Sequence, residues 1–106
     1  MSKIDENRAK LEEIKQLRKG EIPLGPIEKW MIQELEVERL PSKKTKGSII
    51  KYRHKAFENP DNVEGNFVIH KLHKKREMIR LQNLHYLVQR IETILNYMEQ
   101  EERSEG

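Results

Sequence analysis

The sequence contains no cysteine, so no disulfide can cross-link the chain and no thiolate can hold a metal or act as a nucleophile. Aromatic residues make up 6% of the chain and hydrophobic residues 35%, below the about 45–50% apolar share of an ordinary globular domain. Uninterrupted apolar runs are short, as at 67–69, so a membrane-spanning helix is not expected. With a polar start that does not resemble a signal peptide, these absences predict a cytoplasmic protein.

The length allows one domain at most, so residues 1–106 are predicted to form a single small helical domain. A chain of this size buries a modest fraction of its surface. Because apolar side chains are also few, the core is expected to need a partner helix for its completion. The predicted fold class is all-α.

Apolar residues at helical spacing predict two short helices that form a hairpin over residues 1–40. The first is expected over about 4–18, and the second over about 26–39, with Pro26 in its first turn. The glycines and prolines of 20–26 indicate the turn between them. Trp30, the only tryptophan, has apolar neighbours at helical spacing and is expected in the core.

Residues 41–66 are predicted to be a basic, irregular region, and two structures are open for its second part. Ile49, Tyr52, Ala56 and Phe57 lie on one face if this part is helical. Alternatively, residues 50–53 alternate as in a strand, and 67–69 could pair with them in a small hairpin. The helical spacing favours the short helix.

A long helix is predicted over residues 67–102, followed by a short tail at 103–106, because glycine and proline are absent from 67–101. Its apolar residues recur with alternating spacings of three and four, which is typical of a coiled-coil seam. We expect this seam to form a homodimer; an intramolecular bundle is the alternative. The seam comprises Leu81, Leu84, Leu87, Val88, Ile91, Ile94, Leu95 and Met98.

Positive charge is concentrated in the middle of the chain. Residues 41–80 hold eleven of the twenty-one Lys and Arg and only four acidic residues, whereas 23–40 and 81–106 are net acidic. Such asymmetry is typical of a surface that binds a polyanion. The candidate nucleic-acid-binding residues are Lys43, Lys44, Lys46, Lys51, Arg53, Lys55, Lys71, Lys74, Lys75, Arg76 and Arg80.

The sequence contains no arrangement of residues that predicts catalysis. The sequence contains neither the G-x-S-x-G elbow that presents a serine nucleophile nor a glycine-rich phosphate-binding loop. His70, His73 and Glu77 would share a helix face, but the neighbouring lysines and arginines would repel a metal dication. No enzyme activity, cofactor or metal is therefore expected.

The basic segment 70–80 runs into the apolar heptads, and this layout resembles a basic-region leucine zipper in outline. It lacks the Asn and paired Ala with which that family reads bases. Residues 26–103 also resemble the small phage late-gene activators, with a helix, a polar loop and a second long helix. Neither resemblance assigns a site residue to this chain.

These observations predict a non-enzymatic, nucleic-acid-associated helical regulator of phage or mobile-element type. It is expected to bind DNA through its basic middle, to regulate transcription and to form a dimer through its last helix. The alternative is a protein–protein adaptor or assembly factor that docks its long helix on a larger partner.

Overall fold

The computed structural model describes residues 2–41, 49–72 and 75–105. These residues form three α-helices, a short 3-10 turn and five strands in two antiparallel sheets. In chain order the elements are α1 (Lys3–Lys15), β1 (Glu21–Pro23), α2 (Gly25–Glu34), β2 (Glu38–Arg39), β3 (Ile49–Arg53), η1 (Lys55–Phe57), β4 (Asn66–His70), β5 (Met78–Arg80) and α3 (Leu81–Glu105).

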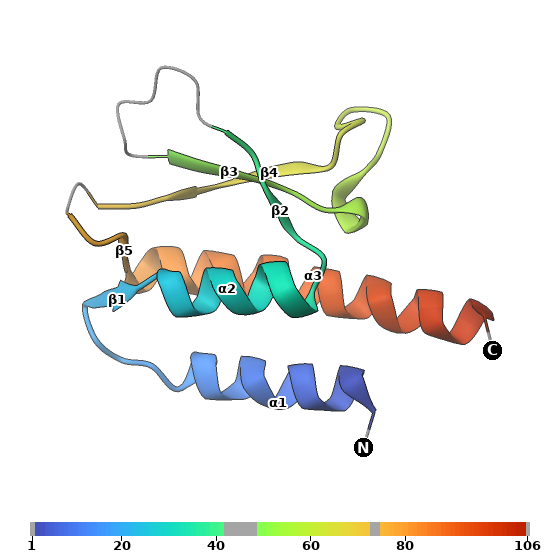
Figure 1. The fold of residues 1–106 in the computed structure, drawn as a ribbon, viewed down its shortest axis with the longest axis horizontal. Coiled ribbons are helices and arrows are strands. Elements are labelled where there is room, and N and C mark those ends of the chain that lie inside the picture. Colours follow the sequence, from blue (N-terminus) through green and yellow to red (C-terminus); the bar gives the residue numbers. More distant parts are fainter. Residues whose placement is uncertain (1, 42–48, 73–74, 106) are drawn as a thin grey trace.

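The elements are arranged in three layers (Figure 1). The sheet β2–β3–β4 forms the top layer, α2 and α3 lie beneath it, and α1 lies below both. The two-stranded ribbon of β1 and β5 closes one end of the helix layer, while the N- and C-termini lie at the opposite end.

The three-stranded sheet follows from the alternation of side chains along β3 and β4. Ile50 pairs with Ile69, and Tyr52 pairs with Phe67, and all four side chains are buried against the helices. The residues between them point to the other face of the sheet, because successive side chains of a strand alternate. The hairpin alternative for residues 50–53 and 67–69 is therefore correct, and the short helix is wrong.

Local chemistry determines where the first two helices begin and how the second ends. The Ser2 hydroxyl accepts a hydrogen bond from the Asp5 amide at 3.2 Å and so caps α1. Pro26 occupies the first turn of α2, where its missing N–H is not needed. Glu36 adopts a left-handed conformation, with φ of 61°, and turns the chain from α2 into β2.

Among the glycines that the structure describes, Gly65 is the one whose backbone conformation the sheet requires. Its φ is +72°, and a Cβ at this position would lie 2.3 Å from the His54 carbonyl oxygen. Only glycine adopts this region readily and leaves room for that oxygen. Gly65 thereby brings the turn before β4 against the end of β3.

The all-α fold class is wrong, because residues 67–80 contain β4 and β5 where a continuous helix was expected. Phe67 and Ile69 are buried while Val68 and His70 are exposed, which is the two-residue period of a strand. The long helix begins at residue 81 and not at 67, and α2 ends at Glu34 and not at 39.

The coiled-coil description of the last helix is also wrong. Of the predicted seam, the central side chains from Leu84 to Leu95 are buried within the chain itself, and Leu81 and Met98 pack at the margin of the same core. They face α1, α2 and both sheets, so the heptad-like pattern is the inner stripe of a core helix.

Candidate functional site

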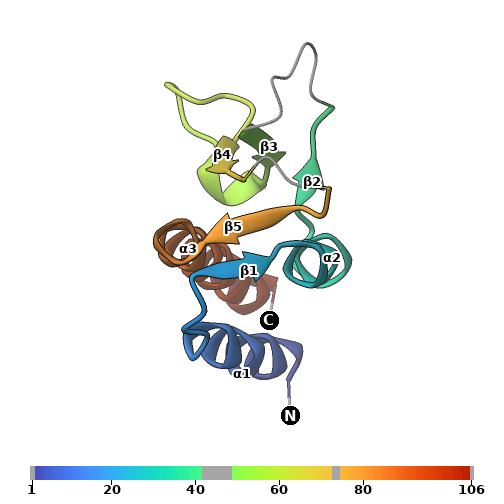
Figure 2. The ribbon, with the colours of Figure 1, turned by 90° about the vertical axis from the view of Figure 1, so that its left-hand side faces the viewer.

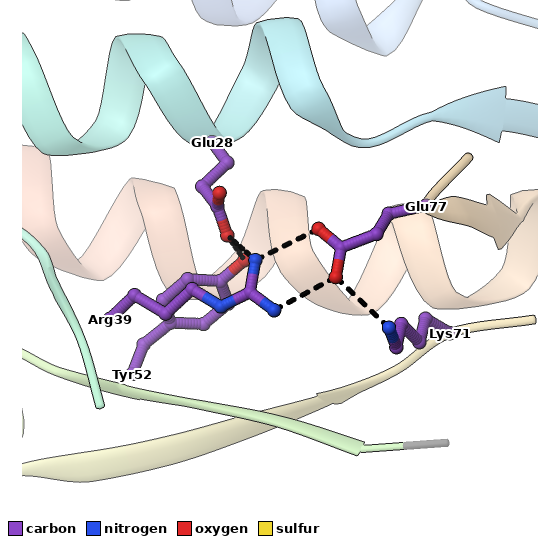
Figure 3. A network of polar contacts seen from close by, with 5 residues as sticks. All are labelled: Glu28, Arg39, Tyr52, Lys71 and Glu77. Atoms are coloured by element: carbon purple, nitrogen blue, oxygen red, sulfur yellow. Dashed lines mark hydrogen bonds and ion pairs between the residues drawn. The ribbon is translucent and has the colours of Figure 1, made fainter. Parts of the chain in front are cut away.

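A cluster of polar side chains lies between the three-stranded sheet and the helix layer (Figure 3). The Arg39 guanidinium is at its centre: Nη1 donates to Glu28 Oε1 at 2.9 Å and to Glu77 Oε1 at 2.8 Å, and Nη2 donates to Glu77 Oε2 at 2.8 Å. The Tyr52 hydroxyl donates to Glu28 Oε1 at 2.7 Å, and Lys71 Nζ donates to Glu77 Oε2 at 2.9 Å. The cluster therefore joins α2, β2, β3 and the connection between β4 and β5.

The electrostatics of this cluster favour a structural role. Hydrogen bonds from Arg39 and then from Lys71 lower the pKa of Glu77 to about 2, and burial followed by the bond to Glu28 raises the pKa of Tyr52. Two carboxylates face two cations, so the charges of the cluster balance. Neither Glu77 nor Tyr52 is poised to exchange a proton near neutral pH, as a general acid or base would be.

His54 is a second buried polar group, at the end of β3. Burial lowers its pKa, and the ring Nδ1 accepts a hydrogen bond from the Ala56 amide at 2.9 Å. The ring also meets Tyr97 of α3 edge-on, with centroids 5.9 Å apart. These contacts make the neutral imidazole part of the packing between η1 and α3.

The free energy of unfolding is expected to fall in two steps as the pH is lowered. Because the pKa of His54 is lowered by folding, the unfolded chain takes up that proton first, and stability decreases below about pH 6.5. Because the pKa of Glu77 falls from 4.5 to about 2 on folding, a second loss occurs between these two pH values. Its partial exposure reduces the second loss to about 2 kcal/mol.

Urea unfolding at a series of pH values from about 8 to about 2 measures both steps. His54→Gln should flatten the upper step and Glu77→Gln the lower one. An unfolding free energy that stays constant between pH 7 and pH 3 would contradict the assignment of both groups.

The described members of the predicted nucleic-acid-binding set are distributed over several elements. Lys51 is exposed on the outer face of β3, and Lys55 is exposed in η1. Arg53 bonds Glu38 at 2.6 Å, and Lys71 belongs to the polar cluster. Lys75, Arg76 and Arg80 are exposed beside β5, while Lys43, Lys44, Lys46 and Lys74 lie outside the described residues.

Two further cations, Arg18 and Lys19, lie near those of β5. They were not among the nucleic-acid-binding residues predicted from the sequence. The Leu81 amide donates to the Gly20 carbonyl, and β1 pairs with β5, so Arg18 and Lys19 lie at the same end of the molecule as β5. We call this set the basic end; its exposed cations are Arg18, Lys19, Lys75, Arg76 and Arg80, and the exposed Glu21 of β1 lies opposite Arg80. Figure 2 views the molecule from this end.

Acidic residues gather at the opposite, terminal end. The first turn of α1 carries Asp5 and Glu6, and the last turns of α3 carry Glu99, Glu101 and Glu102. The start of α1 and the end of α3 lie side by side, because Arg8 of α1 bonds Glu99 at 2.6 Å (Figure 1). The molecule is therefore electrically asymmetric along its length.

Sequence reasoning missed the polar cluster as well as Arg18 and Lys19. The only signal for the cluster was that Glu28, Arg39 and Tyr52 are polar residues beside core positions. The helix face that would unite His70 and Glu77 does not exist, since His70 is in β4 and the Glu77 carboxylate contacts Arg39 and Lys71. His73 lies outside the described residues.

No family model, curated protein or solved structure matches the chain. Relatives therefore provide no support for DNA binding or transcription regulation. Within the described residues, no helix combines the length and apolar character that crossing a membrane requires.

Proposed function

We propose that the protein is a non-enzymatic binding protein that contacts the phosphate backbone of nucleic acid with its basic end. The observation that supports this most is the convergence of exposed cations from two distant parts of the chain on the ribbon of β1 and β5. Arginine and lysine side chains on one surface are the usual means of contacting phosphates.

The helix arrangement reinforces the positive potential of the basic end. Helix α3 begins directly after β5, and α2 begins just after β1, so the N-termini of both helices lie there (Figure 1). The N-terminus of a helix carries partial positive charge from its aligned peptide dipoles. Glu77, which is close in sequence to Arg76, is neutralised within the polar cluster and does not oppose this charge.

The acidic terminal end orients the protein on a polyanion. Phosphates would repel Glu101 and Glu102 and attract the opposite end of the molecule. Contacts of this kind position a protein on nucleic acid without reading base sequence. The adaptor alternative, in which the long helix docks on a partner, is less well supported, because the apolar stripe of α3 is covered by the chain itself.

Binding to a short duplex is expected to weaken steeply with salt. Each phosphate contact contributes about 0.9 to the slope of log affinity against log salt, so five cations give a slope of about −4 to −5. Lys75→Ala with Arg76→Ala should flatten the slope by about 2 units. Fluorescence anisotropy of a labelled duplex, titrated at several salt concentrations, measures this slope.

The matched control is Lys3→Ala with Arg103→Ala, which removes two cations from the terminal end. Lys3 and Arg103 form exposed ion pairs with Glu34 and Glu99, so their loss should leave the slope unchanged. Equal losses in the two double variants would show that only net charge matters. Failure of the wild type to bind duplex at low salt would refute the proposed function.

A further inference from the structure

Within residues 2–41, 49–72 and 75–105, no strand pairs with the outer edge of β4. The sheet order is β2–β3–β4, and in Figure 2 β4 is the outermost strand on the side of α3. The His54 amide bonds the Gly65 carbonyl at 3.0 Å, which fixes the alternation of the antiparallel ladder. The amides and carbonyls of Asn66, Val68 and His70 therefore point away from β3.

Side chains bond backbone groups at both ends of this edge. At one end, the Asn62 side chain accepts from the Asn66 amide at 3.1 Å and donates to the Asn66 carbonyl at 2.9 Å. At the other end, Asn83 Nδ2 donates to the His70 carbonyl at 3.4 Å. Between them, the backbone amide and carbonyl of Val68 have no hydrogen-bond partner in the described part of the chain.

A groove runs along this edge between β4 and α3. One hollow, of about 480 Å³, lies between the Val68–His70 half of β4 and the side chains of Gln82, Asn83 and Tyr86. A second, of about 460 Å³, shares Val68 and Tyr86 with the first and extends to Arg90. Val68 and Tyr86 are 38% and 42% exposed, so both present apolar surface in the groove.

The charge of the groove is positive. The Arg90 guanidinium lies 4.4 Å from the centroid of the Tyr86 ring and 5.8 Å from that of Phe57. Its Nη2 donates to the Tyr86 hydroxyl, and its buried Nε has no hydrogen-bond partner among the described residues. The described residues that line both hollows include no Asp or Glu. A carboxylate is therefore the complementary group for an occupant of this groove.

We propose that the groove between β4 and α3 binds an extended, acidic peptide segment of a partner protein as a fourth strand of the sheet. The Val68 amide and carbonyl would bond the backbone of the peptide, and Arg90 would bond a carboxylate side chain. A second copy of β4 is a poorer occupant, because Asn66–His70 offers no acidic side chain. This inference does not depend on the basic end, which contributes no residue to the groove.

Strand addition is tested with seven-residue peptides of alternating valine and threonine, with both termini chemically blocked. Each peptide of the set carries a single glutamate, at a different position. At least one glutamate register should bind saturably, and exchanging its glutamate for lysine should weaken binding about tenfold, the effect of about 1.4 kcal/mol. The same peptide with methylated backbone nitrogens should not bind, because it cannot donate to the Val68 carbonyl. Fluorescence anisotropy measures these affinities on the unmodified protein.

Substitutions in the protein test the same contacts that the peptide changes test. Val68→Pro removes the outward amide at an edge position, where proline is tolerated, and should abolish binding, whereas the matched Val68→Ala should retain it. Arg90→Gln should remove the preference for glutamate over lysine. Circular dichroism is used to check that each variant is folded.

Several results would overturn the proposal. These are the absence of binding by every peptide at about 1 mM, equal binding of the methylated peptide, and unchanged binding by folded Val68→Pro. Sedimentation that shows a wild-type dimer lost in Val68→Pro would assign the edge to a second copy of the chain and also overturn it. Duplex binding by the basic end is measured separately, so either proposal can fail alone.

Discussion

Ile91→Asp is expected to unfold the chain and not merely to dissociate it. Ile91 is fully buried in α3 and belongs to the core shared by the helices and both sheets. The change removes a buried apolar side chain and places a carboxylate where no partner is available, which costs more than about 4 kcal/mol. A domain of this size has only about 5–15 kcal/mol of stability, so helical circular dichroism should collapse.

The matched control for this substitution is Gln89→Asp, on the exposed face of the same helix. It introduces the same side chain in the same helix and should leave the spectrum unchanged. If Ile91 instead lay in an interface between two copies, Ile91→Asp would remain folded and sediment as a monomer while the wild type sedimented as a dimer. Homodimerisation stays a prediction that this experiment tests.

Arg39→Ala is expected to lower the free energy of unfolding by about 2–4 kcal/mol. The substitution leaves the Glu28 and Glu77 carboxylates, whose side chains are 17% and 29% exposed, without the cation that lies between them. The loss comes from these carboxylates, which remain partly desolvated, more than from the missing guanidinium contact itself. Chemical unfolding at pH 7 measures it.

The control for Arg39→Ala is Arg53→Ala on the adjacent strand. Arg53 also bonds a glutamate, Glu38, but that pair is exposed to solvent, and exposed pairs contribute little. Adding Glu28→Gln to Arg39→Ala should restore part of the stability by removing a carboxylate that has lost its cation, whereas Glu77 keeps Lys71 as a partner. If Arg39→Ala were no more destabilising than Arg53→Ala, the cluster would not hold the layers together.

Local signals in the sequence predicted the two N-terminal helices approximately. The apolar spacing around Leu11 and Ile14 and the proline at position 26 act within one or two turns, so they identify helices without knowledge of the rest of the fold. The position of Trp30 in the core was also predicted correctly.

The strands were missed because short strands carry little local information. β5 has three residues and β2 has two, and each is stabilised by pairing with a segment far away in the sequence. In residues 67–70 the alternation was visible, but the lack of glycine and proline up to residue 101 suggested one helix. Tertiary pairing overrode that pattern.

The candidate sites were predictable only in part. A surplus of positive charge near residues 75–80 can be counted along the chain, and these residues do lie at the basic end. The contribution of Arg18 and Lys19 depends on the pairing of β1 with β5, and the balance of charge around Arg39 depends on four elements meeting. Counting charges along the chain does not show which distant segments meet in the fold.

The pairing of Glu21 with Arg80 also constrains when the protein can fold during synthesis. β1 leaves the ribosome early, but its partner β5 emerges only after α2 and the whole three-stranded sheet have been made. Until then α1 cannot pack on α3, and the apolar residues of α1 and α2 remain uncovered. Folding of the N-terminal third is therefore expected to await the last quarter of the chain, which is the slow, non-local closure typical of high contact order.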